Sequence, residues 1–191
     1  MKKTFTTIFI VFSILLLMAF TKYRRQPVII VNNIISAPVV EIDTKIKPKE
    51  IKIKDHKAFL TALGHRESGN RYNIVNRYGY MGRYQFGKST LRTLRIKVSR
   101  SEFLKDTLLQ EEAMTKLLRF NKKRLQKYID RYSGETVNGV LITESGLLAA
   151  AHLGGAGSVK KWFRTGKVRR DGNGVKITSY MKRFGGYILY L

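Results

Sequence analysis

"SEFLKDTLLQEEAMTKLLRFNKKRLQKYIDRYSG", residues 101–134, carries the longest helical pattern in this chain. Its apolar residues recur every three or four positions and form one stripe: Phe103, Leu104, Leu108, Leu109, Met114, Leu117, Leu118, Leu125, Tyr128 and Ile129. This spacing is the period of an α-helix, so we expect the stripe to face the core and the charged positions to face solvent. Ser101 is expected to start the segment and Gly134 to end it, with two or more helices sharing it.

Helices are also predicted on both sides of this segment. Upstream, "DHKAFLTALGHRESG" has apolar positions at helical spacing, with Asp55 as its N-cap and Gly69 at its C-terminal end. Downstream, "TESGLLAAAHLGG" predicts a helix of small residues that begins at Thr143 and packs closely against its neighbours. "AGSVKKWFRTG" predicts a short helix that stops at Gly166. Few strand patterns occur, so the fold class is mainly α, with one all-helical domain over residues 55–191.

The N-terminal residues differ in composition from this domain. Residues 1–21 hold the basic start "MKK" and the apolar run "FTTIFIVFSILLLMAF", which is typical of a signal peptide or an uncleaved signal anchor. Both interpretations predict export to the periplasm or cell envelope, and the second adds a membrane anchor. Residues 22–54 are β-branched, contain Pro38 and Pro48, and are interpreted as an extended linker.

The charge of the chain indicates an anionic partner. Lys and Arg number 37 against 13 Asp and Glu, giving a formal net charge of +24. Nucleic acid, an acidic membrane surface and an anionic envelope polymer all fit this charge, but export argues against nucleic acid. With no cysteine, the chain has no disulfide framework and no thiol nucleophile. Three histidines without a ligand-spacing motif predict no metal site, and no cofactor motif is present.

One carboxylate stands out in "GHRESGNRYNIVNRYGYMGRYQFG", residues 64–87. Glu67 is the only acid in this stretch and falls in the last turn of the first predicted helix. The negative end of the helix dipole and burial against tyrosines would both raise the pKa of Glu67, whereas nearby arginines would lower it. The net direction therefore stays open. A carboxylic acid that keeps its proton near neutral pH can protonate a leaving group, while the structural alternative is a salt bridge with Arg71.

Two glycine-containing loops accompany this acid. The loop "NRYGYMGRYQFG" has glycines that allow tight turns and close ligand approach, and its tyrosines and glutamine suit sugar faces, N-acetyl groups and hydroxyls. A second loop places Gly154, Gly155 and Gly157 between two predicted helices. Both loops are expected to face a groove.

Three motifs in order, "ESGN", "GYMGRYQFG" and "AAAHLGGAGSVKKW", together resemble the soluble lytic transglycosylase and goose-type lysozyme families of the lysozyme superfamily. The resemblance spans about residues 55–187 and is nearest to an exported peptidoglycan-lytic branch. It implies a lysozyme-like, all-helical domain with a sugar-binding groove.

The resemblance also implies roles for individual residues. Glu67 matches the catalytic acid/base, and Ser68 matches the serine beside it, which helps to position substrate or catalytic groups. Tyr180 matches a tyrosine near the C-terminus whose hydroxyl faces the catalytic acid. His152 and Leu153 stand where the family has Tyr-Asn, and His152 is expected to line the groove. The loop residues expected to bind substrate are Tyr80, Met81, Tyr84 and Gln85.

The activity implied by the resemblance is that of a peptidoglycan lytic transglycosylase. Such an enzyme cleaves the β-1,4 bond between N-acetylmuramic acid and N-acetylglucosamine and closes a 1,6-anhydro ring. Its partners would be peptidoglycan glycan strands and anionic envelope polymers, with no nucleic acid. One alternative is a lysozyme-type muramidase with Glu144 or Asp171 as second carboxylate. Others are a non-catalytic wall-binding module and, less favoured by export, a basic nucleic-acid binder.

Overall fold

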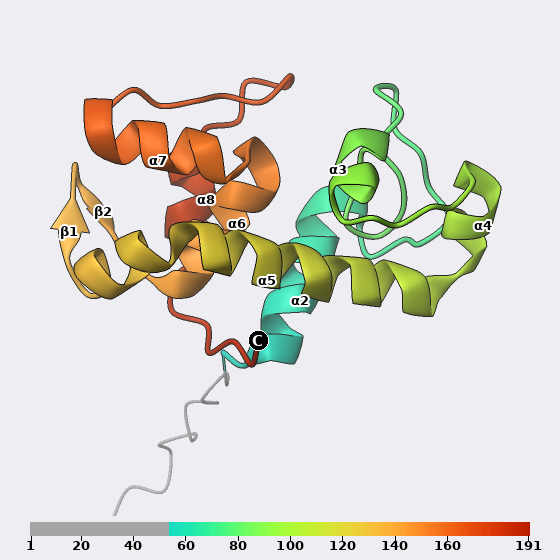
Figure 1. Ribbon diagram of the computed structural model, residues 1–191, viewed down its shortest axis with the longest axis horizontal. Helices are drawn as coiled ribbons and strands as arrows, with labels where there is room; N and C mark the ends of the chain where they lie inside the picture. The colour runs from blue at the N-terminus through green and yellow to red at the C-terminus, as the bar shows by residue number, and fades with distance from the viewer. Residues whose placement is uncertain (1–53) are drawn as a thin grey trace, which may run out of the picture. The chain divides into compact units, whose positions relative to one another are not determined.

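Helices dominate residues 54–191, the part of the chain that the computed structural model describes (Figure 1). The elements in chain order are α2 (His56–Ser68), α3 (Lys88–Thr93), α4 (Arg100–Lys105), α5 (Thr107–Tyr132), β1 (Thr136–Val137), β2 (Val140–Leu141), α6 (Glu144–Gly154), α7 (Ala156–Thr165) and α8 (Ile177–Arg183). The two strands pair as one short antiparallel hairpin. The predicted mainly α fold class is therefore confirmed.

The predicted signal segment, residues 1–21, lies outside the described residues, as does all of the predicted linker, residues 22–54, except Lys54. The described residues belong to one compact unit. No helix within them has both the length and the apolar character needed to cross a bilayer. The predicted membrane anchor lies among residues that are not described, so it stays a prediction.

The long helical segment divides at Asp106, which ends α4 and caps α5 by accepting a hydrogen bond from the N–H of Leu109 at 2.8 Å. Two helices do share the segment, as predicted. The first of them, α4, has Ser99 as its N-cap rather than starting at Ser101. Helix α5 ends at Tyr132, just before the expected Gly134. The expectation that Leu108 belongs to the core is wrong, because that side chain is 80% exposed at the start of α5. Most of the stripe is buried: Phe103, Met114, Leu117, Leu118, Leu125 and Ile129.

Helix α6 lies at the centre of the core, packed against α5, α7 and α8. Every residue from 145 to 151 is buried, and Thr143 caps the helix as predicted, accepting a hydrogen bond from the N–H of Gly146 at 3.1 Å. A Cβ at Gly146 would stand 2.6 Å from the carbonyl oxygen of Met181. The small residues of α6 therefore let α8, which carries Tyr180, approach its backbone closely.

Helix α2 begins and ends as the sequence predicts. The Asp55 carboxylate accepts a hydrogen bond from the N–H of Ala58 at 2.7 Å, and Gly69 ends the helix in the left-handed conformation. Phe59 and Leu63 bury one face in the core. The C-terminal segment of the chain returns to the start of α2 (Figure 1), where the N–H of Ile188 donates to the carbonyl of Lys54 at 2.8 Å. This contact holds the N-terminal end of the helix in place.

Candidate functional site

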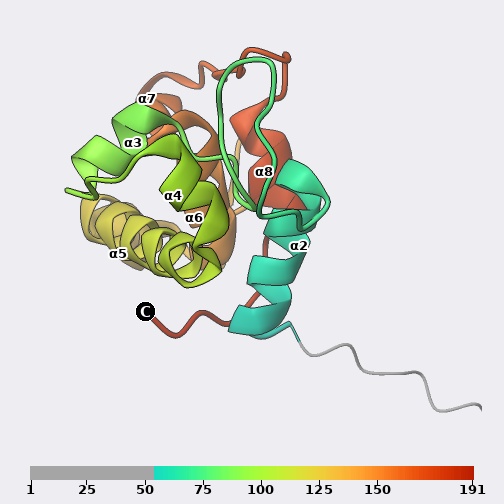
Figure 2. The ribbon, with the colours of Figure 1, turned by 90° about the vertical axis from the view of Figure 1, so that its right-hand side faces the viewer.

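Glu67 lies in the last turn of α2, and its side chain is 14% exposed. It lines a pocket of about 410 Å³. The other lining residues come from the loop that follows α2, the C-terminal end of α6 and the connection between α7 and α8. Figure 2 shows the loop and the connection side by side above α8. Glu67, the lone acid of residues 64–87, therefore lies at the edge of a cavity.

Tyr180 of α8 donates its hydroxyl hydrogen to Oε1 of Glu67 at 2.7 Å. The two residues are 113 positions apart in the chain, so only the packing of α8 brings them together. The pKa of Tyr180 is raised well above the ordinary tyrosine value, first by burial and second by the negative charge of Glu67. Tyr180 therefore remains a neutral donor to the Glu67 carboxylate. The predicted meeting of these two side chains is present.

His152 of α6 approaches the same carboxylate oxygen. Its Nε2 lies 3.7 Å from Oε1 of Glu67, which is within ion-pair range and beyond hydrogen-bond length. The side chain is 7% exposed, and its Nδ1 is buried without a hydrogen-bond partner among residues 54–191. His152 thus lines the pocket beside Glu67.

The glycine-containing loop sends Tyr80 and Gln85 into the pocket, as expected. The carboxamide oxygen of Asn76 accepts hydrogen bonds from the N–H groups of Tyr78 and Tyr80, at 2.9 and 3.1 Å, which fixes the turn. Gln85 has a positive φ of 52° and donates to the carbonyl of Gly82 at 2.9 Å. Asn76 and Tyr78 also line the pocket, and sequence reasoning did not name them as site residues.

Three of the expected substrate-binding residues face inward instead. Met81 and Tyr84 are buried in the hydrophobic core, and neither lines the pocket. Ser68 is buried at the end of α2, where its hydroxyl donates to the carbonyl of Arg83 at 2.8 Å. The prediction that these three side chains contact substrate is therefore corrected: they support the walls of the pocket from within. The alternation of the loop's residues around Gly82 turns Tyr80 and Gln85 outward while Met81 and Tyr84 point into the core.

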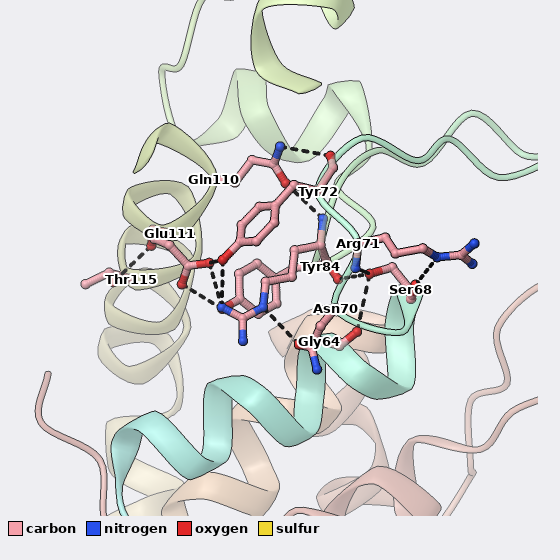
Figure 3. A network of polar contacts seen from close by, with 10 residues as sticks. Gly64, Ser68, Asn70, Arg71, Tyr72, Tyr84, Gln110, Glu111 and Thr115 are labelled. Carbon is pink, nitrogen blue, oxygen red and sulfur yellow. Dashed lines mark hydrogen bonds and ion pairs between the residues drawn. The ribbon is translucent and has the colours of Figure 1, made fainter. Parts of the chain in front are cut away.

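A partly buried polar network, drawn in Figure 3, fastens this loop to α5. Arg83 donates to Glu111 at 2.9 Å, to Asn70 at 3.0 Å and to the hydroxyl of Tyr72 at 3.0 Å. The hydroxyls of Tyr72 and Tyr84 donate to the two oxygens of Glu111 at 2.8 and 2.7 Å. The network ties the end of α2, the loop and α5 into one unit and so holds the wall of the pocket.

Gln110 completes the attachment of the loop. Its side-chain oxygen accepts from the N–H of Arg83 at 2.8 Å, and its nitrogen donates to the carbonyls of Phe103 and Tyr72 at 2.8 and 3.1 Å. A Cβ on Gly82 would collide with the Gln110 side chain, so the loop requires glycine there. Sequence reasoning missed Gln110 and Glu111. Gln110 falls among the apolar positions of the α5 stripe, and a polar residue at such a position indicates a buried hydrogen-bonding role.

The opposite wall of the pocket is the turn at residues 171–173. Oδ1 of Asp171 accepts hydrogen bonds from the N–H groups of Asn173 and Val175, at 2.9 and 2.7 Å. Arg77 donates to the Asn173 side chain at 3.2 Å and joins the two walls. Of the two candidate second carboxylates, Asp171 lines the pocket. Glu144 does not, and it pairs with Lys122 at 2.9 Å.

Within residues 54–191 no group of three His, Asp or Glu side chains is placed to hold a metal ion. No protein-family model, curated protein or solved structure matches the chain.

Proposed function

We propose that this protein is a peptidoglycan lytic transglycosylase with a lysozyme-like catalytic domain. The observation that carries the proposal is the Glu67 carboxyl group, partly buried at a pocket wall and bonded through Oε1 to a tyrosine that remains neutral. Its other oxygen, Oε2, has no hydrogen-bond partner among the described residues. An acid held at one oxygen and free at the other is suited to general acid/base chemistry.

The proposed reaction uses Glu67 twice. In its protonated form, Glu67 donates a proton to the glycosidic oxygen between N-acetylmuramic acid and N-acetylglucosamine, and the bond to the muramyl C1 breaks. The N-acetyl group of the muramyl residue stabilises the positive charge that develops at C1. The Glu67 carboxylate then removes the proton from the muramyl C6 hydroxyl, whose oxygen attacks C1. The products are a 1,6-anhydromuramyl end and a free 4-hydroxyl, with no water consumed.

The other pocket residues bind and orient the strand in this account. Tyr80 and Tyr78 are half exposed at the rim, where aromatic faces suit sugar rings. Gln85 and Asn76 offer amide groups to hydroxyl and N-acetyl groups. The net charge of +24 attracts anionic envelope polymers over a distance, and this attraction weakens with salt.

A lysozyme-type muramidase is the second candidate, and the place of Asp171 in the pocket favours it. A hydrolase of this kind uses two carboxylates across the sugar ring, one of which directs water or attacks C1. Asp171 also stabilises the turn at residues 171–175, because its Oδ1 accepts hydrogen bonds from two backbone N–H groups. Asp171→Asn keeps an oxygen that accepts those bonds and removes the charge, so it separates the two roles.

Digestion of purified peptidoglycan tests the proposal. The protein is expected to release soluble muropeptides, and Asp171→Asn is expected to retain most of that activity. Loss of release in Asp171→Asn with the fold intact would assign the protein to the muramidases. A protein that sediments with peptidoglycan and releases nothing would be a wall-binding module.

A further inference from the structure

A second pocket, of about 450 Å³, borders the one that holds Glu67. The two pockets share Tyr80, Gln85, His152 and Leu153, so they form one continuous groove. The second pocket is lined by α3, the middle of α5 and the junction of α6 with α7. In Figure 1, α3 and α7 stand on the same side of α5. Nothing in the reaction described above uses this part of the groove.

Asn121 of α5 lines the second pocket and has an unsatisfied side chain. It is 3% exposed, and its Nδ2 is buried with no hydrogen-bond partner among residues 54–191. Gln110, on the same buried face of α5, offers the contrast, because its amide makes three hydrogen bonds to backbone groups. Buried amides are normally paired, so the bare Asn121 amide points to a ligand that brings the partner.

The N-terminus of α7 opens on the same pocket. Helix α7 has ten residues, and its N-cap, Gly155, supplies no side-chain hydrogen bond to the first turn. Gly155, Ala156 and Gly157 line the pocket, so no large side chain covers the free N–H groups there. An uncapped helix N-terminus attracts negative charge through its dipole and its unpaired donors.

Arg124 and Phe120, one turn apart on α5, complete the pocket. The Arg124 guanidinium lies 5.3 Å from the centre of the Phe120 ring, and that ring is 36% exposed. The pocket thus combines a cation, an amide, free backbone donors and one apolar face. These groups are suited to a ligand that carries one negative charge next to an apolar or sugar surface.

We propose that the second pocket binds a carboxylate group of the substrate strand, with Asn121, Arg124 and the N-terminus of α7 as its donors. The carboxylate belongs to the muramyl unit. It lies on the lactyl group where no peptide is attached, and on the peptide where the lactyl carboxyl is an amide. The proposal rests on the proposed function, since it assumes a muramyl substrate in the neighbouring pocket. The charge would then select muramyl strands over neutral N-acetylglucosamine polymers.

Two substitutions test the site, each with a matched control. Gly157→Glu places a carboxylate at the start of α7, where a Cβ meets no atom within 4 Å. Thr107→Glu adds the same charge to the exposed first turn of α5, outside the pocket. Arg124→Gln removes the cation. Arg131→Gln removes a similar one, 5.3 Å from the Tyr132 ring and also outside the pocket.

Binding is measured by calorimetry with three probes: N-acetylmuramic acid, muramyl dipeptide, and neutral tri-N-acetylchitotriose. Gly157→Glu and Arg124→Gln are expected to weaken binding of at least one of the two muramyl probes about tenfold, the equivalent of one charged hydrogen bond. They should leave the neutral probe unchanged, and both controls should bind as wild type. A stronger effect on muramyl dipeptide than on N-acetylmuramic acid would place the carboxylate on the peptide. A stronger effect on N-acetylmuramic acid would place it on the lactyl group, because the lactyl carboxyl of muramyl dipeptide is an amide. Equal effects would show a site that takes either carboxylate.

Equal binding of the muramyl probes by wild type, Gly157→Glu and Arg124→Gln would overturn the site. An equal loss of binding in the two control variants would also overturn the site, because it would show that the probes respond to the overall charge of the protein and not to this pocket. These results are separable from failure of the proposed function, because release of muropeptides by the wild-type protein is measured independently. Active protein without a charge-selective pocket refutes only the further inference.

Discussion

Two glutamates of this protein, Glu67 at the end of α2 and Glu111 on α5, each accept a hydrogen bond of 2.7 Å from a tyrosine hydroxyl. Around Glu111 both carboxylate oxygens are engaged, because Arg83 and Tyr72 donate to one and Tyr84 donates to the other. Around Glu67 only Oε1 is engaged by side chains of residues 54–191. Yet Glu111 is the more exposed of the two, at 31% against 14%. The two carboxylates therefore differ in their unused acceptor positions, and this difference, rather than exposure, is the basis for proposing Glu67 as the reactive one.

The largest expected effect concerns Glu67. Glu67→Gln keeps the size of the side chain and an oxygen for Tyr180, but it removes the acid/base. Lytic activity should fall by a factor of about 10² to 10⁴, the usual contribution of general acid–base catalysis. Thermal unfolding followed by circular dichroism should stay close to wild type. Activity within a factor of two of wild type would remove Glu67 from the reaction.

Glu111→Gln should show the reverse pattern. It leaves Arg83, whose side chain is 13% exposed, without its charge partner. We expect a loss of about 2 kcal/mol in the free energy of unfolding, as for hydrogen bonds to charged groups. The neighbouring Glu112 is a matched control, because its ion pair with Lys116 is exposed. Glu112→Gln should cost less than about 0.5 kcal/mol in urea unfolding. Equal losses for the two variants would contradict the structural role of Glu111.

The two tyrosines sharpen the comparison. Tyr180→Phe removes the hydroxyl that holds Glu67, and lytic activity should fall about tenfold, which corresponds to about 1.4 kcal/mol. Tyr84→Phe removes a donor to Glu111 and should lower stability by about 1 kcal/mol, with activity little changed. Initial rates of muropeptide release and urea midpoints measure the two effects. A larger loss of activity in Tyr84→Phe than in Tyr180→Phe would reverse the assignment.

The last expected effect, absent at neutral pH, is a dependence of stability on alkaline pH. Burial, and then the nearby glutamates, raise the pKa values of Tyr84 and Tyr180 above the ordinary value of 10.0. Above pH 10 the unfolded chain loses protons that the folded chain keeps, so the free energy of unfolding should fall as pH rises. The fall per pH unit is at most about 1.4 kcal/mol for each tyrosine. Urea unfolding between pH 8 and 11 should show a flatter decline in the double Phe variant, and an identical decline would exclude both tyrosines as its source.

Much of the fold could be predicted because local signals agree with it. Capping residues such as Asp55 and Thr143 mark helix starts, and Gly69 and Gly166 mark helix ends. The Asn138-Gly139 turn of the β1–β2 hairpin, with positive φ at both residues, was a recognisable signal that the sequence reading passed over. Helices α3 and α8 are too short for periodicity to identify them.

The site was less predictable, because it is made by contacts between distant parts of the chain. The residues on the α2 side were found from the motif at Glu67. Asp171 entered the pocket only through the fold, since a turn 104 positions away by residue number (171 minus 67) has no local signature. The side chains of Met81 and Tyr84 could not be oriented from sequence, because their direction depends on the turn around Gly82 and its contact with Gln110.

The central claim, that Glu67 acts alone as acid and base with a sugar hydroxyl as acceptor, is tested most directly by digesting purified peptidoglycan in water enriched in heavy oxygen. Mass spectrometry then reads the muramyl ends of the released muropeptides. The account predicts 1,6-anhydromuramyl ends, lighter by one water and without the heavy isotope, because the C6 oxygen of the sugar closes the ring. Reducing muramyl ends that carry the heavy isotope would contradict it, since water would then be the acceptor and Asp171 the first candidate for its partner.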